Sequence, residues 1–314
     1  MAVGKKAVFF TFSALFMLAI VFTWMFFNTS YRVGEESDLV KFKTSNMNEF
    51  VAGFDQDVER GVYIAGFRAL ISAEGYVSNT KVFLNDSVAS LGEAMINGTI
   101  NGVPAPMMTD STLLAWLTRI KNAAVGVGII VNASYVGLEI NQSSPWLVDF
   151  FANITYNVTD FTNTAVFRRS KIASAQISII GLRDPVYTVY TNGQIIRAIN
   201  NTLYEGDYAS GTPPNLDTTN LKDHINQLMY ANSTGPSYLM RLEGNLGDSP
   251  MGIESIVRLP DLQGQGLPVY EKSSIDYIYF NTSNPGFCVI KDTFEDWFRL
   301  DDAHLAKYQV ECKP

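Results

Sequence analysis

The sequence predicts an α+β protein with an N-terminal transmembrane helix that continues into an amphipathic stalk helix. A mostly antiparallel β domain with a few short helices follows, outside the cytoplasm. Three observations carry this prediction: an uncharged run from Val8 to Phe27, a helical apolar period over 38–73, and a period of two from Val125 onward. The expected segments are a cytoplasmic basic leader (1–7), a transmembrane helix (8–27), a stalk helix (28–75), a helical layer with an antiparallel sheet (76–205) and a C-terminal α+β portion (206–314).

The run from Val8 to Phe27 is long enough to cross a bilayer, because twenty helical residues span about 30 Å. Lys5 and Lys6 precede it and acidic residues follow at 35, 36 and 38, which predicts a cytoplasmic N-terminus and an extracytoplasmic C-terminal domain. The bulky residues 24–27 at its end disfavour cleavage by an ordinary signal peptidase. We therefore expect a single-pass cell-membrane protein that contacts the lipid bilayer through this run.

The start of the chain also carries a short processing motif. The sequence Lys5-Lys6-Ala7 followed by Val8-Phe9-Phe10 resembles the cleavage site of archaeal type IV pilin-like precursors. That resemblance implies a cut between Ala7 and Val8, after which the helix packs into a filament. Phe9 is bulkier than the family usually carries, and no glutamate occurs early in the helix. Later segments look similar to those of uncharacterised archaeal membrane-anchored surface proteins, a resemblance that implies no particular activity.

The stalk has an apolar stripe. Met47, Phe54, Val58, Val62 and Ala69 fall at helical spacing, and polar residues occupy the opposite side. The stripe must be covered either by the globular domain or by neighbouring subunits, so self-assembly or binding of other surface proteins through this helix is expected. A glycine at position 75 is typical of a helix end.

Two short helices and three strands are predicted next. One helix begins at Asp86-Ser87, and another is capped by residues 109–111 and reaches Ala123. Alternating residues over 136–140, 146–158 and 173–179 predict an antiparallel meander with one solvated face. Farther on, the pattern predicts extended segments at 186–190, 238–242, 252–257 and 275–280, and a helix over 221–230.

Cys288 and Cys312 are the only cysteines. Both lie in strand-like segments, and in an oxidising compartment they can close a loop that ties down the C-terminus. Two buried free thiols are the alternative. A metal site would need further ligands that the surrounding sequence does not supply.

Asparagine sequons are in excess. Random placement of the 23 asparagines and 45 serines and threonines would give about three Asn-x-Ser/Thr motifs, whereas the chain has ten. The excess favours a glycosylated protein, although asparagine and threonine also cluster in turns and at strand edges. Asn28 lies beside the apolar run, and the candidate glycosylation sites are Asn85, Asn97, Asn132, Asn141, Asn153, Asn157, Asn200, Asn232 and Asn281.

The sequence offers little catalytic chemistry. It has two histidines and none of the common nucleotide-binding, hydrolase or metalloprotease motifs, so we expect no enzyme, no cofactor and no metal. The net charge of −8 excludes nucleic acid as a partner. We expect a membrane-anchored, glycosylated cell-surface structural or adhesion protein, with a pilin-like filament subunit as its most specific form. The alternative is an extracytoplasmic domain on a signal anchor that binds carbohydrate or peptide, with a pocket lined by Trp146, Tyr277 and Tyr279.

Overall fold

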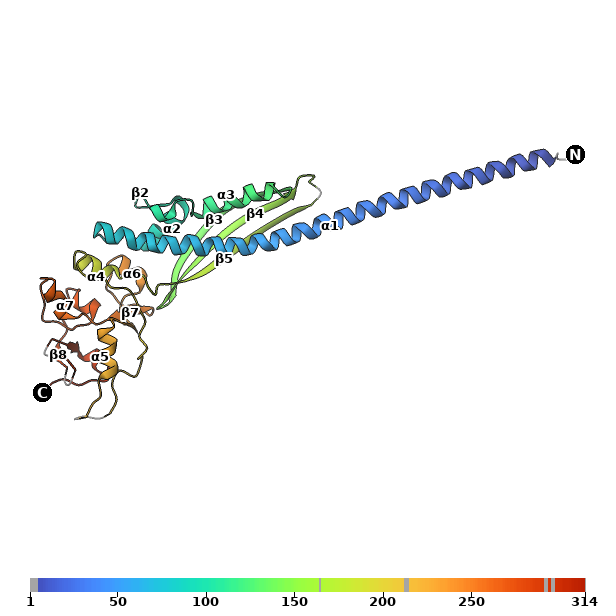
Figure 1. Cartoon of the computed structure of the whole chain (residues 1–314). Coiled ribbons are helices and arrows are strands. Elements are labelled where there is room, and N and C mark those ends of the chain that lie inside the picture. The colour runs from blue at the N-terminus through green and yellow to red at the C-terminus, as the bar shows by residue number, and fades with distance from the viewer. Residues whose placement is uncertain (1–4, 164, 212–214, 291–292, 295–296, 314) are drawn as a thin grey trace.

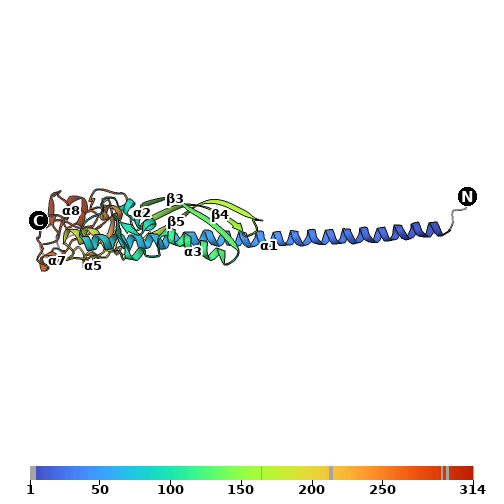
Figure 2. The same cartoon turned by 90° about the horizontal axis from the view of Figure 1, so that it is seen from above.

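The computed structural model describes residues 5–163, 165–211, 215–290, 293–294 and 297–313, but not the side chains of 5–12 and 28–40. One helix dominates its shape. Helix α1 (Lys5–Thr80) is 76 residues long; its N-terminal part projects from the body, and its C-terminal part is packed into the body (Figures 1 and 2). Among the described side chains of α1, the first that is buried is Met47. The helix from Lys5 to Lys41 is therefore an extension of about 55 Å.

The prediction of a membrane-spanning helix was wrong, and the single-pass membrane location fails with it. Within the part of the chain that the structure describes, no helix combines the length and the apolar character that crossing a bilayer requires.

The C-terminal half of α1 forms one wall of the core. The predicted stripe is buried, with Met47, Phe54, Val62 and Ala69 each 3% exposed or less. At Gly66 the helix lies so close to the sheet that an added Cβ would come within 2.7 Å of Ile177. The globular domain therefore covers the stripe, and neighbouring subunits are not needed for it. The helix does not end at position 75 as expected, because Val77, one turn before its end, is also buried.

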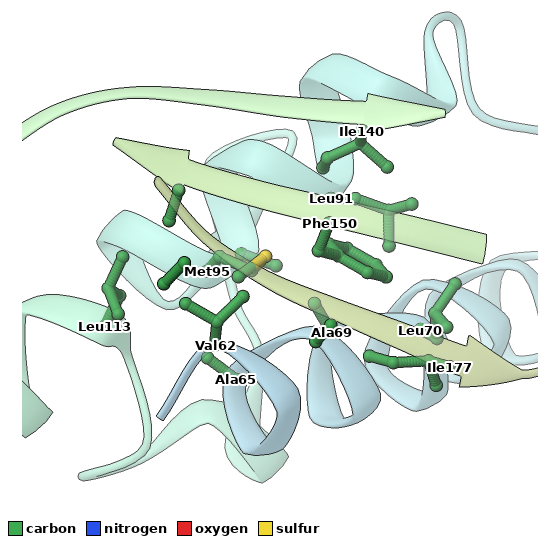
Figure 3. Close-up of a cluster of buried hydrophobic side chains, with 14 of the residues drawn as sticks. Val62, Ala65, Ala69, Leu70, Leu91, Met95, Leu113, Ile140, Phe150 and Ile177 are labelled. Carbon is green, nitrogen blue, oxygen red and sulfur yellow. The ribbon is translucent and has the colours of Figure 1, made fainter. Parts of the chain in front are cut away.

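The core lies between α1 and a three-stranded sheet. Strands β3 (Ile129–Ser144), β4 (Leu147–Asp160) and β5 (Val166–Ser178) form an antiparallel meander in the order β3-β4-β5, which confirms the sequence prediction. Side chains such as Phe150 and Ile177 point from the sheet towards α1, while Leu91 and Leu113 contribute from the next two helices (Figure 3). These are α2 (Ser87–Asn97), capped by Asp86 as predicted, and α3 (Leu113–Val125), whose cap is Thr112 rather than residues 109–111.

Short elements connect α2 and α3 and build the C-terminal portion. Strands β1 (Thr99–Ile100) and β2 (Val103–Pro104) form a hairpin, and a 3-10 turn η1 (Pro106–Met108) follows it. The C-terminal strands form two antiparallel pairs, β6 (Tyr230–Ser233) with β7 (Gly252–Ser255) and β8 (Phe287–Val289) with β9 (Arg299–Asp301). The helices there are α4 (Pro185–Tyr190), α5 (Thr219–Asn226), α6 (Tyr238–Leu242), α7 (Leu259–Gly264), α8 (Asp276–Tyr279) and α9 (Asp302–Leu305).

Three segments predicted as extended are therefore helical: 186–190, 238–242 and 275–280. Local caps explain two of them. The Asp184 side chain accepts a hydrogen bond from the backbone N–H of Val186 at the start of α4, and Ser237 does the same for Met240 in α6. The predicted strand over 252–257 is confirmed as β7, whereas the predicted helix over 221–230 ends early and its last residue begins β6.

The predicted disulfide between Cys288 and Cys312 is confirmed. Cys288 lies in β8, and Cys312 pairs with Ile290 just beyond that strand. Closing a loop of 24 residues removes conformational freedom from the unfolded chain, an effect of about 3–4 kcal/mol in the chain-entropy treatment. The disulfide therefore fixes the C-terminus to the rest of the domain.

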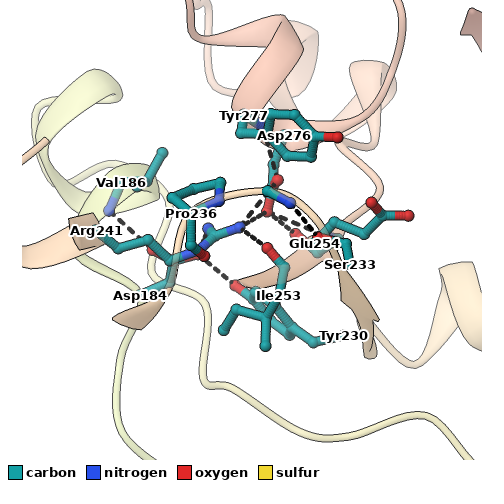
Figure 4. Close-up of polar contacts among 12 residues, drawn as sticks. Asp184, Val186, Tyr230, Ser233, Pro236, Arg241, Ile253, Glu254, Asp276 and Tyr277 are labelled. Carbon is teal, nitrogen blue, oxygen red and sulfur yellow. Dashed lines mark hydrogen bonds and ion pairs between the residues drawn. The ribbon is translucent and has the colours of Figure 1, made fainter. Parts of the chain in front are cut away.

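A buried guanidinium joins the C-terminal elements (Figure 4). Arg241 of α6 is 0% exposed, and its Nη1 lies 2.7 Å from the Asp184 carboxylate while its Nη2 lies 3.1 Å from that of Asp276. Its Nη2 also donates to the carbonyl of Ile253 at 2.5 Å. Burial alone would lower the pKa of Arg241, but the two carboxylates outweigh that effect and raise it. The cation thus links α4, α6, β7 and α8 through groups that have no access to water.

Candidate functional site

The projecting part of α1 is the most unusual surface of the molecule. Eleven large apolar side chains from Leu15 to Phe27 are each 50–74% exposed. A contiguous exposed apolar surface of this kind marks an interaction site in soluble proteins. The side chains are Leu15, Phe16, Met17, Leu18, Ile20, Val21, Phe22, Trp24, Met25, Phe26 and Phe27.

These side chains surround the helix instead of forming one stripe. Leu15, Phe16, Met17 and Leu18 are consecutive, so successive side chains point about 100° apart and cover every side of the helix. A helix that is apolar all round is stable when it is buried on all sides. One flat contact would leave half of this surface in water, whereas a bundle of several helices would bury all of it.

The C-terminal portion also has an aromatic cleft. It has a volume of about 450 Å³ and lies between the end of α4 and the segments around 268 and 280. Tyr190 and Phe280 stack with their ring centroids 5.2 Å apart on one wall, and Tyr279 lies beside Tyr270. Tyr190 and Tyr270 remain 44% and 52% exposed. The cleft thus offers two accessible ring faces, together with the polar groups of Lys272 and Asn281.

Sequence reasoning named a different set of aromatic residues for a pocket. Tyr277 is 9% exposed and Tyr279 2% exposed, which places both in the core, and Trp146 packs partly buried against the main core. Of the three, Tyr279 alone lines the aromatic cleft. Sequence reasoning missed Tyr190 and Tyr270 because they come from segments eighty residues apart, with no shared motif. The one local signal was the proline at 268, which favours a loop around Tyr270.

The second buried charge cluster contains His304. Its Nδ1 lies 2.8 Å from Asp301 and its Nε2 lies 3.2 Å from Glu254, which also pairs with Lys307 at 2.8 Å. Burial alone would lower the pKa of His304, but the hydrogen bonds with Asp301 and Glu254 raise it to about 9. Both ring nitrogens then donate to carboxylates, so neither is free to act as a general base. The arrangement holds α9 and β9 against β7.

The pH dependence of stability should report this cluster. The raised pKa of His304 gives stability that is complete below about pH 6.5 and is lost as the pH rises through about 9. We expect the free energy of unfolding to fall by about 2–3 kcal/mol over that window, and the fall to be absent in His304→Gln. Urea unfolding of both proteins at pH 6, 7.5 and 9.5 measures it. If the free energy of unfolding changes with pH in the same way in the wild type and in His304→Gln, the pH dependence does not come from His304.

The sequons lie mostly on accessible surface. Asn85, Asn97, Asn132, Asn141, Asn200 and Asn232 are exposed, and Asn153, Asn157 and Asn281 are partly exposed. Asn153 and Asn157 lie on the solvated face of β4, as the alternation predicted. Asn132 and Asn157 are direct neighbours across β3 and β4. The side chains of Asn28, Ala7 and Val8 lie outside the described residues; the backbone between Ala7 and Val8 is part of α1.

Comparisons of the chain with protein-family models, with curated proteins and with solved structures found no match. The functional argument therefore rests on the residues and geometry of this chain.

Proposed function

We propose that this protein is a glycosylated structural or adhesion subunit that assembles with further copies of itself through the projecting part of α1. The observation that carries the proposal is the exposed apolar surface from Leu15 to Phe27, which surrounds the helix. Other copies of the chain bring the same surface, so a bundle of these segments buries each of them. Such a bundle is the filament core that the resemblance to pilin-like precursors implies.

The energetics favour association through this segment. Fully burying one large apolar side chain from a fully exposed state contributes about 1.5–3 kcal/mol, and eleven such side chains are 50–74% exposed in the single chain. Scaled by these exposed fractions, their burial contributes about 10–20 kcal/mol. This is enough to offset the roughly 4–15 kcal/mol that is lost when two proteins lose their independent motion. The remaining body has a net negative surface and a solvated sheet face with sequons, which suits the outside of an assembly.

The proposal is tested by measuring the size of the purified full chain over a range of concentrations. Light scattering after size exclusion should give particles many times larger than 34.8 kDa, and electron microscopy should show filaments. Intact mass spectrometry of the same sample should show added glycan, and loss of residues 1–7 if the leader is cut. A monomer at every concentration would refute assembly.

A second candidate function is binding of a carbohydrate, and the aromatic cleft is the observation that favours it. Exposed tyrosine rings beside hydrogen-bonding side chains match the apolar faces and hydroxyl groups of a sugar ring. A glycan array should then detect binding by the wild-type protein and a loss of roughly tenfold in Tyr270→Ala. Tyr63→Ala is the matched control, since Tyr63 is similarly exposed but lies on α1. Equal array signals for the two variants would remove this candidate.

A further inference from the structure

A separate cleft lies at the C-terminal end of α1, on the body of the molecule. It has a volume of about 420 Å³, within the range of small-molecule sites. The last turns of α1 form one wall, and the β1–β2 hairpin with the start of η1 forms the other. Ile71, Ile100, Val103 and Met107 make its surface largely apolar. None of the described residues that line it is charged.

Gly75 lines this cleft without a side chain. It lies inside α1, where glycine is less favourable than alanine because its backbone loses more freedom on folding. Its φ is not positive, so the backbone does not require glycine. A Cβ added at this position would meet nothing within 4 Å, whereas one at Gly66 would meet the sheet. Close packing therefore does not require glycine at position 75, and the space beside it is open to another molecule.

Ser72 contributes an unsatisfied polar group to the same cleft. It precedes Gly75 by one helical turn and is 8% exposed, and its Oγ has no hydrogen-bond partner among the described residues. Buried hydroxyls are normally hydrogen-bonded, and one without a partner needs an explanation. A bound molecule with an oxygen acceptor can supply the missing bond, with Ser72 turning about χ1 to reach it.

We propose that this cleft binds a small uncharged ligand with an apolar body and one hydroxyl or carbonyl group. Because none of the described lining residues is charged, we expect a neutral molecule. Its apolar body would contact the aliphatic walls, and its polar group would form a hydrogen bond with Ser72. This site is independent of assembly through the projecting helix, because it lies on the body, more than forty residues along α1 from Phe27.

The test uses p-cresol and p-xylene as probes, which have nearly the same shape, because p-cresol carries a hydroxyl where p-xylene has its second methyl group. In ligand-observed NMR titrations of the full chain, p-cresol should bind about fivefold more tightly than p-xylene, the factor expected for one net hydrogen bond. Ser72→Ala should remove that preference and leave p-xylene binding intact. Equal affinities of the two probes for the wild-type protein would overturn the role of Ser72.

Filling the cleft provides the second test. Gly75→Leu should weaken both probes at least tenfold while raising the melting temperature, because leucine favours the helix. Gly53→Leu is the matched control: Gly53 also lies in α1 with nothing within 4 Å of an added Cβ, but outside the cleft. Unchanged probe binding in Gly75→Leu would refute the site. A change in particle size instead of probe affinity would identify another copy of the chain as the occupant and refute the small-ligand proposal.

Discussion

Replacing Arg241 by methionine is expected to lower the free energy of unfolding by about 3–5 kcal/mol, the cost of leaving buried charges without their partner. Methionine fills a similar volume, so lost packing contributes little. Asp184 and Asp276 would remain with 0% exposure and no cation between them. Burial already raises the pKa of Asp276, and removing the guanidinium would raise it further. Urea denaturation at pH 7 measures the loss.

Removal of the carboxylates together with the cation is the control for this prediction. The triple variant Arg241→Met, Asp184→Asn, Asp276→Asn should recover part of the lost stability, since its buried groups are neutral. It should not recover all of it, because Asp184 accepts from the Val186 N–H through one carboxylate oxygen and from the Tyr230 hydroxyl through the other, whereas asparagine has only one acceptor oxygen. A single variant within 1 kcal/mol or so of the wild type would contradict the central role of Arg241.

A charge in the projecting segment should weaken assembly without affecting the fold. Phe22 is 65% exposed in the single chain, so Phe22→Glu should leave the melting temperature of the body unchanged. In a bundle the same change loses about 1.5–3 kcal/mol of apolar burial and adds the cost of a buried carboxylate. We expect the concentration needed for assembly to rise more than tenfold, as measured by sedimentation velocity.

Leu203→Glu is the matched control, because Leu203 is 78% exposed but lies on the body. It introduces the same charge at another exposed apolar position and should assemble like the wild type. If Phe22→Glu and Leu203→Glu assemble equally well, the projecting segment is not the assembly surface.

The larger elements could be predicted from the sequence because each repeats its pattern many times. The stripe from Met47 to Ala69 repeats over six turns, and the alternation in β4 runs without a break from Phe150 to Asp160. The helices α4, α6 and α8 have only four to six residues, too few for a helical period to appear. Their residues are aromatic and β-branched, which favours strands locally. Tertiary contacts such as the pairing of Asp276 with Arg241 override that preference.

The functional features also differ in whether the sequence could predict them. The disulfide and the apolar run of α1 could be predicted because each depends on residue type alone. The two clefts could not, since their walls combine segments distant in sequence, and the significance of Gly75 appears only when the space around it is known. The prediction of a membrane-spanning helix was wrong because it relied on a run of uncharged residues alone. No described helix has both the length and the apolar character that crossing a bilayer requires.

Cryo-electron microscopy of the purified full chain tests the central claim most directly. The account predicts filaments whose core is a bundle of α1 helices, with Leu15 to Phe27 of each copy contacting the same segment of other copies and with the sheet and C-terminal portion on the outside. Single particles of 34.8 kDa with the projecting helix free in solvent, or filaments whose copies contact one another only through the body, would contradict it.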